Sequence, residues 1–373
     1  MSTDPWSADA VLVLGFGGPE GPDQVWPFLE RVTAGRGVPR ERLAVVAEHY
    51  LSLGGVSPIN AQNRSLTEEL ESRLRARGVA APVTLAHRNS PPYAVEGLTD
   101  LAAAGARQVL ALATSAFPSY SGCRQYREDL GQGLVDAGLV DAFEVRKIGP
   151  FFDLAAVVEA NVRAVRAGLA QLVDQGSARP IVLFSTHSLP TMAAATAGPD
   201  GGDGYTAAHR FVAEEVIAAL GGTSDDGDPI AWRLVYQSRS GSPSVPWLEP
   251  DILAALAEVA ALHRDNRPDG VLVVPLGFLT DHVEVIWDLD TQASQTAYEL
   301  GLPFVRAATI GTDPGFLDAL ADLVAHHATG GAHPAPARLA AAPGQGRCCG
   351  DGCCANPRST RPAVAAARTG DLP

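Results

Sequence analysis

The feature that most constrains this chain is a short apolar run that ends abruptly in polar residues. Residues Ile181–Pro190 read IVLFSTHSLP, so four apolar residues are followed by hydroxyls, an imidazole and a Leu-Pro stop. Such a run is typical of a strand buried on both faces of a parallel sheet. Ligands of open α/β sheets lie at the carboxyl ends of the strands, which makes His187 a candidate for chemistry. The alternative is a histidine that only caps a turn and hydrogen-bonds locally.

A second apolar run ends in acidic residues. Gly270–Asp290 reads GVLVVPLGFLTDHVEVIWDLD. If the chain turns helical after Thr280, then Asp281, Glu284 and Asp288 lie at spacings of three and four on one face. Repulsion makes such a file costly unless a cation or a proton relieves it. The alternative, an acidic first turn that complements the helix dipole, explains Asp281 better than the other two carboxylates, which lie among apolar residues.

Similar apolar runs alternate with helical segments along the chain, which predicts an α/β fold. Two successive series of similar size predict two doubly wound, Rossmann-like domains with parallel sheets, residues 8–150 and 151–328, facing each other across a cleft. Residues 329–373 are rich in Ala, Gly and Pro. We therefore expect an irregular tail, except where its cysteines are fixed in a thiolate site. Strands are predicted at Ala10–Leu14, Val83–His87, Gln108–Thr114, Phe143–Ile148, Ile181–Phe184, Ala231–Tyr236, Val271–Pro275 and Pro303–Ala307. Helices are predicted at Pro22–Val32, Pro39–Tyr50, Ala61–Arg77, Val95–Ala104, Asp153–Gln171, Thr206–Leu220, Pro250–His263 and Glu284–Leu300.

The composition is that of a globular protein. With 373 residues, 46% hydrophobic and 19% charged, the chain is long enough for two domains of common size. A net charge of −14 argues against nucleic acid or an anionic membrane as a partner. No signal segment opens the chain and no apolar run reaches membrane-spanning length, so we expect a cytoplasmic protein without a membrane span, and a monomer.

Two segments near predicted strands are candidates for ligand contact. Gly15–Pro19 lacks the glycine spacing of a dinucleotide loop but allows close approach to a flat or bulky ligand, to which Phe16 offers an aromatic face. Ser57 either caps the next helix or contacts a ligand, whereas capping is the better interpretation for Asn60. The segment SAFPSYSGCRQY follows another strand and suits a ligand with flat and anionic parts. Its candidate residues are Tyr120, Ser121, Arg124 and Tyr126.

The five cysteines suggest a thiolate site. They are one isolated Cys123 and the tight set Cys348, Cys349, Cys353 and Cys354. This set is too crowded for an ordinary disulfide framework. Four thiolates suit tetrahedral zinc as well as a [2Fe–2S] cluster, and their spacing alone does not decide between the two.

Several motifs together resemble the ferrochelatase family. They are LGFGGPEGP, GGVSPIN, IVLFSTHSLP, VYQSRSGSPSVPWLEPD and GFLTDHVEVIWDLD, and the match covers about residues 8–328. CRQYRED and the C-terminal cysteines resemble the actinobacterial branch of the family. The resemblance implies a class II chelatase fold, in which two Rossmann-like domains, each with a four-stranded parallel sheet, enclose a porphyrin cleft.

The resemblance also implies an activity. The implied reaction inserts ferrous iron into coproporphyrin III and gives iron coproporphyrin for haem biosynthesis, with transient contacts to other enzymes of that pathway. Protoporphyrin IX as substrate is the main alternative, and a cobalt or sirohydrochlorin-type chelatase is another. Enzymes that use protoporphyrin tend to present an apolar lip, whereas Arg36–Gly55 mixes charged with apolar residues and favours a solvated entrance. The four propionates of coproporphyrin would suit the donors Ser57, Asn60, Ser121, Arg124 and Tyr126.

The resemblance assigns roles to individual residues. His187 matches the catalytic histidine of the family and Glu284 the catalytic glutamate across the porphyrin, with Asp288 continuing the acidic file as a further metal-binding residue. Gln292 stands where some relatives carry another carboxylate, so the resemblance does not extend to an outer metal site. Ser57 and Tyr126 resemble porphyrin contacts.

Two further implications concern Phe16 and the cysteines. Phe16 occupies the place of a tyrosine that can ligate the product iron in several relatives; phenylalanine cannot ligate, but it can stack on the macrocycle. Cys123 and three of the four tail cysteines are implied to hold a [2Fe–2S] cluster, with structural zinc as the rival. One member of an adjacent cysteine pair is expected to be left over.

Overall fold

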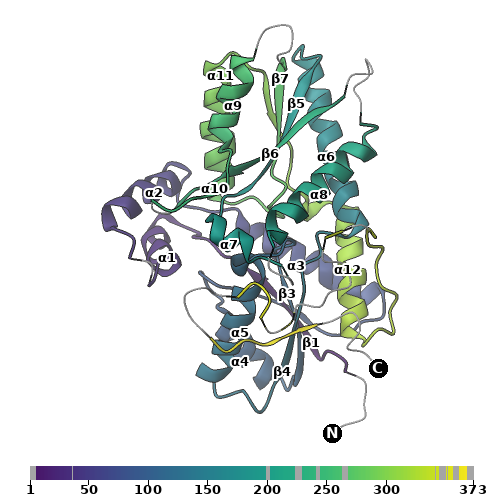
Figure 1. The fold of residues 1–373 in the computed structure, drawn as a ribbon. Coiled ribbons are helices and arrows are strands. Elements are labelled where there is room, and N and C mark those ends of the chain that lie inside the picture. Colours follow the sequence, from purple (N-terminus) through teal and green to yellow (C-terminus); the bar gives the residue numbers. More distant parts are fainter. Residues whose placement is uncertain are drawn as a thin grey trace.

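The computed structural model describes most of the chain. The described residues are 6–35, 37–198, 202–222, 229–240, 244–262, 268–340, 342–343, 350, 352–355 and 361–367. Figure 1 shows two sheets, one above the other, each flanked by helices, with α1 and α2 projecting at one side.

Both sheets are parallel, which confirms the predicted α/β fold. The first has the order β2-β1-β3-β4-β9 and the second the order β6-β5-β7-β8. The strands of the first sheet are β1 (Ala10–Gly15), β2 (Val83–His87), β3 (Gln108–Ala113), β4 (Glu144–Ile148) and β9 (Ala365–Ala367). Those of the second sheet are β5 (Pro180–His187), β6 (Ala231–Gln237), β7 (Gly270–Val274) and β8 (Phe304–Arg306).

β1, β3, β5 and β7 consist largely of apolar residues because both faces of each sheet are covered. Along β1, Val11 and Val13 join one core cluster while Leu12 and Leu14 join another on the opposite face. The first of these clusters also holds Phe184 of β5, so one core runs between the two halves of the molecule. Burial on both faces removes the polar alternation that a half-exposed strand would show.

Helices connect the strands and cover the sheets. They are α1 (Val25–Val32), α2 (Arg40–Ser52), α3 (Ile59–Ala76), α4 (Ala94–Ala103), α5 (Gln125–Asp136), α6 (Ala155–Asp174), α7 (Thr191–Ala195), α8 (Gly204–Ala219), α9 (Ile252–Ala261), α10 (Val283–Val285), α11 (Ser294–Glu299) and α12 (Pro314–Ala328). Short 3₁₀ turns are η1 (Pro22–Gln24) and η4 (Ile310–Thr312), and π-helical segments are η2 (Tyr120–Arg124) and η3 (Ile286–Ala293).

Several segments differ from the sequence prediction. The helix predicted at Glu284–Leu300 is interrupted by η3, and no helix was predicted where the chain forms α5, α7 and α12. The tail is not irregular throughout, because Ala365–Ala367 pairs with β4 as a fifth strand of the first sheet. The domain limits at residues 150 and 328 stay a prediction. Among the described residues, no helix is long and apolar enough to cross a membrane.

Candidate active site

His187 ends β5, as the sequence predicted. Its Nδ1 lies 2.6 Å from the carbonyl oxygen of Ser188. A carbonyl only accepts, so Nδ1 carries the hydrogen, and in the neutral form of the ring the lone pair is on Nε2. Nε2 lies 3.7 Å from Oε2 of Glu284, and the two side chains are 32% and 43% exposed. The fold therefore brings the two candidate catalytic residues together at a site that solvent reaches.

Their spacing corrects one expectation about the site. Aromatic carbon needs about 3.5 Å of clearance on each face. The 3.7 Å between His187 Nε2 and Glu284 Oε2 therefore cannot hold a macrocycle. The expectation that Glu284 lies across the porphyrin from His187 does not match this arrangement, in which the two side chains lie close together.

Glu284 is fixed by the residues on either side of it. Val283 is buried in a cluster with α1 and α2, and Val285 is buried in the core beneath the second sheet. The neighbouring valines thus anchor α10 in two separate cores while the carboxylate between them stays half-exposed. This explains why an acidic residue occurs within an apolar stretch.

Asp288 lies one turn further on, within η3. Burial is the main reason that its pKa rises to about 6, and the negative charge of Glu284 adds to the rise. Hydrogen bonds from the Ser238 hydroxyl and from Gln237 Nε2, at 3.3 Å for the latter, partly oppose it. A carboxyl group with this pKa can gain and lose a proton close to neutral pH.

The residues that hold Asp288 were missed by the sequence analysis. Gln237 is oriented because its Oε1 accepts a hydrogen bond of 2.7 Å from Ser185, which turns the amide nitrogen toward Asp288. Ser238 has a left-handed backbone with φ of 60°, an uncommon conformation for a non-glycine residue. Gln237 and Ser238 follow the apolar run of β6, so the rule that singled out His187 could have found them.

Asp281 does not belong to the acidic file, contrary to the prediction. The helix begins only at Val283, and Asp281 precedes it. Its backbone N–H donates to Gln62 Oε1 at 2.8 Å, and its carboxylate accepts from Arg306 at 3.0 Å. Arg306 also pairs with Asp290 and so holds both ends of the acidic segment.

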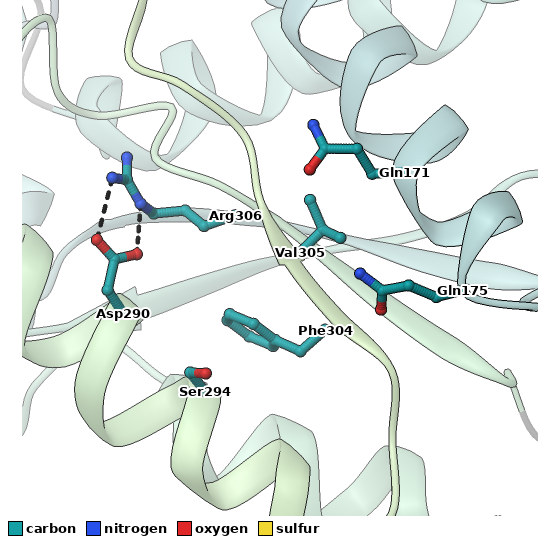
Figure 2. Close-up of a pocket in the computed structure, with 7 residues that line it drawn as sticks. All are labelled: Gln171, Gln175, Asp290, Ser294, Phe304, Val305 and Arg306. Carbon is teal, nitrogen blue, oxygen red and sulfur yellow. Dashed lines mark hydrogen bonds and ion pairs between the residues drawn. The ribbon is translucent and has the colours of Figure 1, made fainter.

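A pocket of about 330 Å³ lies beside Arg306. Figure 2 shows the Arg306–Asp290 ion pair on one side of it, and Gln171 of α6 and Gln175 at the end of that helix on the other. The lining residues are Gln171, Gln175, Asp290, Ser294, Phe304, Val305 and Arg306. Neither His187 nor Glu284 is among these lining residues, so this pocket is separate from the candidate active site.

α2 also contributes to the site, although the sequence analysis treated it only as an entrance. His49 stacks on Trp287 of η3, with ring centroids 4.1 Å apart. Tyr50 is buried, and its pKa is raised well above the usual value, first by burial and then by the charges of Glu284 and Asp288. Glu41, Arg42 and Glu48 are exposed on α2, in keeping with a solvated surface, whereas Arg36 lies outside the described residues.

Phe16 and Tyr126 are linked through Arg88, a residue that the sequence analysis did not select. The Arg88 guanidinium lies 5.9 Å from the centre of the Phe16 ring and 5.1 Å from that of Tyr126, and it pairs with Asp129. Phe16 is 38% exposed and can offer its ring to a ligand. Tyr126 is buried, which raises its pKa to about 12, so its hydroxyl stays protonated.

Two predicted anion donors have an acceptor within the protein. Tyr120 donates its hydroxyl to Glu128 Oε2 and Arg124 donates Nε to Glu128 Oε1, each at 3.0 Å. Glu128 is buried, so these bonds offset the cost of burying its charge. The expected role of Tyr120 and Arg124 as ligand donors is weakened by this pairing, whereas Ser121 is exposed.

Ser57 and Asn60 shape the glycine-rich loop and do not cap a helix. α3 begins at Ile59, and within the described chain no side chain caps it. Asn60 instead accepts from the N–H of Gly18 at 3.0 Å and donates to its carbonyl at 2.9 Å. Ser57 donates its backbone N–H to Pro19, and a Cβ on Gly18 would come within 2.6 Å of the Ser57 Cβ. The capping preferred for Asn60 is therefore wrong, and of the two alternatives for Ser57 only ligand contact stays a prediction.

Three of the five cysteines fall in the described chain, while Cys348 and Cys349 lie outside it. Cys123 is buried in η2, with its Sγ 3.6 Å from the ammonium of Lys147. Cys353 and Cys354 are buried with Sγ atoms 3.7 Å apart, and Cys354 Sγ accepts from the N–H of Gly198 at 3.1 Å. Buried thiols beside a cation and an N–H donor suit thiolate ligands.

The tail is held against the helix that follows Cys123. Arg127 donates to the carbonyls of Val364 at 2.7 Å and Gly350 at 3.4 Å. Within the described residues, no group of three or more His, Cys, Asp or Glu side chains is arranged to hold a metal ion.

Comparison with known proteins places the chain in a class. Residues 8–328 match the family model Ferrochelatase, and the chain therefore belongs to the ferrochelatase family, as the sequence motifs predicted.

Its relatives include several coproporphyrin III ferrochelatases. The protein of that name from Leifsonia xyli subsp. xyli (strain CTCB07) is 43% identical over 97% of this chain and 95% of its own length. Those from Streptomyces coelicolor (strain ATCC BAA-471 / A3(2) / M145) and Nocardia farcinica (strain IFM 10152) are each 44% identical over 96% of this chain, and over 96% and 99% of their own lengths. Among solved structures, SirB from Bacillus subtilis with Fe3+ has a TM-score of 0.47 and 12% identity over 85% of this chain and 94% of that chain. That likeness is too distant to support a further conclusion.

Proposed function

We propose that this chain inserts ferrous iron into coproporphyrin III and gives iron coproporphyrin III, a step of haem biosynthesis, with His187 and Glu284 as its catalytic residues. Family membership and the names of its relatives support the reaction. The observation that carries the assignment of the site is the 3.7 Å distance between His187 Nε2 and Glu284 Oε2.

The residues suit the chemistry of metal insertion. The reaction exchanges one Fe2+ for two pyrrole protons, so the site must accept protons and guide a cation. Neutral His187 can take a pyrrole proton at Nε2 because that atom bears the lone pair. The Glu284 carboxylate stabilises the resulting imidazolium, and Asp288, whose pKa is about 6, can pass protons on to solvent. Imidazole and carboxylate are also suitable ligands for the incoming Fe2+.

Coproporphyrin as the substrate is supported by the charge of the entrance. Coproporphyrin carries four propionates, whereas protoporphyrin replaces two of them with vinyl groups. Exposed charged side chains on α2, among them Glu41, Arg42 and Glu48, favour the more soluble substrate, although Val45 and Leu51 of the same helix are also exposed. Phe16 offers a stacking face, and Ser57 and Ser121 remain predicted polar contacts.

The catalytic assignment is tested by His187→Ala with His326→Ala as the matched control. His326 also hydrogen-bonds through Nδ1 to a backbone carbonyl, at 2.8 Å from His333 O, but it lies in α12. We expect His187→Ala to abolish turnover while porphyrin still binds, because one side chain changes little of a cleft that holds a macrocycle. His326→Ala should keep turnover. Near wild-type rates for His187→Ala would refute the assignment.

The substrate is tested separately by steady-state kinetics with both porphyrins in one detergent-free buffer. We expect a higher kcat/KM for coproporphyrin III, since each lost propionate contact is worth roughly 1–3 kcal/mol. Equal values, or a preference for protoporphyrin IX, would refute the substrate and leave the chelatase assignment intact.

We further propose that Cys123 and three of the four tail cysteines hold a [2Fe–2S] cluster, with structural zinc as the rival. Support comes from the burial of Cys123, Cys353 and Cys354 and from the Lys147 ammonium, which favours a thiolate at Cys123. Bound there, the cluster would supply one-electron redox chemistry or tie the tail to the body of the protein. A monomeric state, a cytoplasmic location and contacts with other enzymes of haem biosynthesis stay predictions.

A further inference from the structure

Three buried polar side chains lie against the backbone of His187. They are Thr186, the preceding residue in β5, and Tyr205 and His209, which are four residues apart on α8. The Thr186 hydroxyl lies 2.7 Å from the Tyr205 hydroxyl and 2.9 Å from His209 Nε2. The Tyr205 hydroxyl lies 2.9 Å from the carbonyl oxygen of His187.

The positions of the hydrogens in this network follow from counting donors. His209 Nδ1 lies 2.8 Å from the carbonyl of Tyr205 and must carry a hydrogen. Burial lowers the pKa of His209 to about 3, so the ring is neutral and Nε2 can only accept. Thr186 therefore donates to His209. The single hydrogen of the Tyr205 hydroxyl then lies between two acceptors, the His187 carbonyl oxygen and Thr186 Oγ1, as a bifurcated hydrogen bond.

We propose that Tyr205 is a positioning residue for His187. The peptide group between His187 and Ser188 is held at both of its polar atoms. Tyr205 donates to its carbonyl, and its N–H donates to the carbonyl of Gln237 at 2.7 Å. This peptide plane places Ser188, whose own carbonyl accepts from His187 Nδ1 and thereby keeps the lone pair on Nε2. The inference rests on the proposed function of His187.

The surroundings leave this network little room to rearrange. A Cβ on Gly277 would come within 2.1 Å of Thr186 Oγ1, so the glycine makes space for that hydroxyl. The His209 ring stacks on Phe117 with centroids 3.7 Å apart, and Phe117 follows β3 of the other sheet. The network therefore connects the backbone of His187 to the contact between the two halves of the molecule.

The test compares Tyr205→Phe with His209→Phe. Tyr205→Phe keeps the buried ring and removes the donor to the His187 carbonyl. His209→Phe keeps a ring that can stack on Phe117, and it allows Thr186 to donate to Tyr205 instead, so that Tyr205 still donates to His187. Ser177→Ala is the control, because it removes a hydroxyl that donates to Asp269 at 2.6 Å beside the amino-terminal ends of β5 and β7.

We expect Tyr205→Phe to lower kcat about tenfold to a hundredfold without raising the KM for porphyrin, since small misplacements of a catalytic group have effects of this size. His209→Phe and Ser177→Ala should keep kcat within about threefold of wild type. The second measurement is independent of turnover. Nitrogen-15 spectra of the histidine rings, with the His187 signal assigned through His187→Ala, should show the Nδ1–H tautomer in wild type and a tautomer mixture in Tyr205→Phe.

A wild-type kcat and tautomer in Tyr205→Phe would overturn the proposal. Should Tyr205→Phe fail to fold, loss of the Nδ1–H tautomer in His209→Phe would also overturn it, because that variant retains Tyr205. The tautomer spectrum reports the position of His187 even if His187→Ala proves active, so failure of this inference and failure of the proposed function are distinguishable.

Discussion

Replacing Ser238 with glycine should move the acidic limb of the turnover pH profile to higher pH. The Ser238 hydroxyl donates to Asp288, and this bond opposes the burial that raises the pKa of Asp288 to about 6. Glycine is the suitable replacement because Ser238 has φ of 60°, which glycine adopts without strain. The substitution thus removes one hydrogen bond and adds no backbone cost.

The magnitude follows from the hydrogen bond that is lost. A hydrogen bond to a charged group contributes about 1.5–3 kcal/mol, and one pKa unit corresponds to about 1.4 kcal/mol. Gln237 still donates to the same carboxylate oxygen at 3.3 Å, which favours the lower end of this range. We therefore expect a rise of about one unit. Only the ionised carboxylate accepts protons, so kcat should fall as the pH drops through about 7 in the variant, against about 6 in wild type.

The assay is the initial rate of coproporphyrin consumption with saturating Fe2+ under anaerobic conditions, from about pH 5 to about pH 8. Ser177→Ala is the matched control, since it also removes a serine bond to an aspartate but lies away from the site. Asp288→Asn should abolish the limb. An unshifted limb in Ser238→Gly, or a limb that persists in Asp288→Asn, would refute the role given to Asp288.

Three further predictions concern stability and the cysteines. Asp288→Asn should raise the free energy of unfolding at pH 7.5 by at most about 3 kcal/mol. The fold raises the pKa of Asp288 from its usual value near 4 to about 6, so the ionised carboxylate destabilises the protein above that pH. This destabilisation disappears as the pH falls and the carboxyl group is protonated. Denaturant titrations at pH 7.5 and pH 4.5 check this, and a difference between variant and wild type that does not shrink at the lower pH would contradict it. Gly277→Ala should destabilise the fold by about 1–3 kcal/mol, since its Cβ would meet the Thr186 hydroxyl, whereas Gly138→Ala, in open space at φ of 67°, pays only backbone strain. Cys123→Ser should remove the visible absorption expected of a [2Fe–2S] cluster in the purified protein and lower its soluble yield. Ser121→Ala is the control and should change neither. Stoichiometric zinc without inorganic sulfide would favour structural zinc instead of the cluster.

The sequence by itself determined β1 to β8 and the two catalytic candidates, but not β9. Because both sheets are covered on both faces, β1, β3, β5 and β7 appear as apolar runs, and the carboxyl end of β5 is marked by its first polar residues. This pattern located Val83–His87 to the residue and identified His187 without a structure. Glu284 was recognisable because a carboxylate among valines is costly unless it has a function.

Tertiary structure alone decided which partners the polar residues have. Asp281 pairs with Arg306, whereas Arg124 and Tyr120 donate to Glu128, and the order of residues along the chain did not indicate the pairing of Asp281 with Arg306. Likewise, Asn60 is next to a helix start but holds Gly18, which is 42 residues away. The π-helical segment that carries Asp288 was also not predicted from the sequence. Side-chain pairing between distant segments is set by the packed fold, so it could be read only after the two sheets were in place.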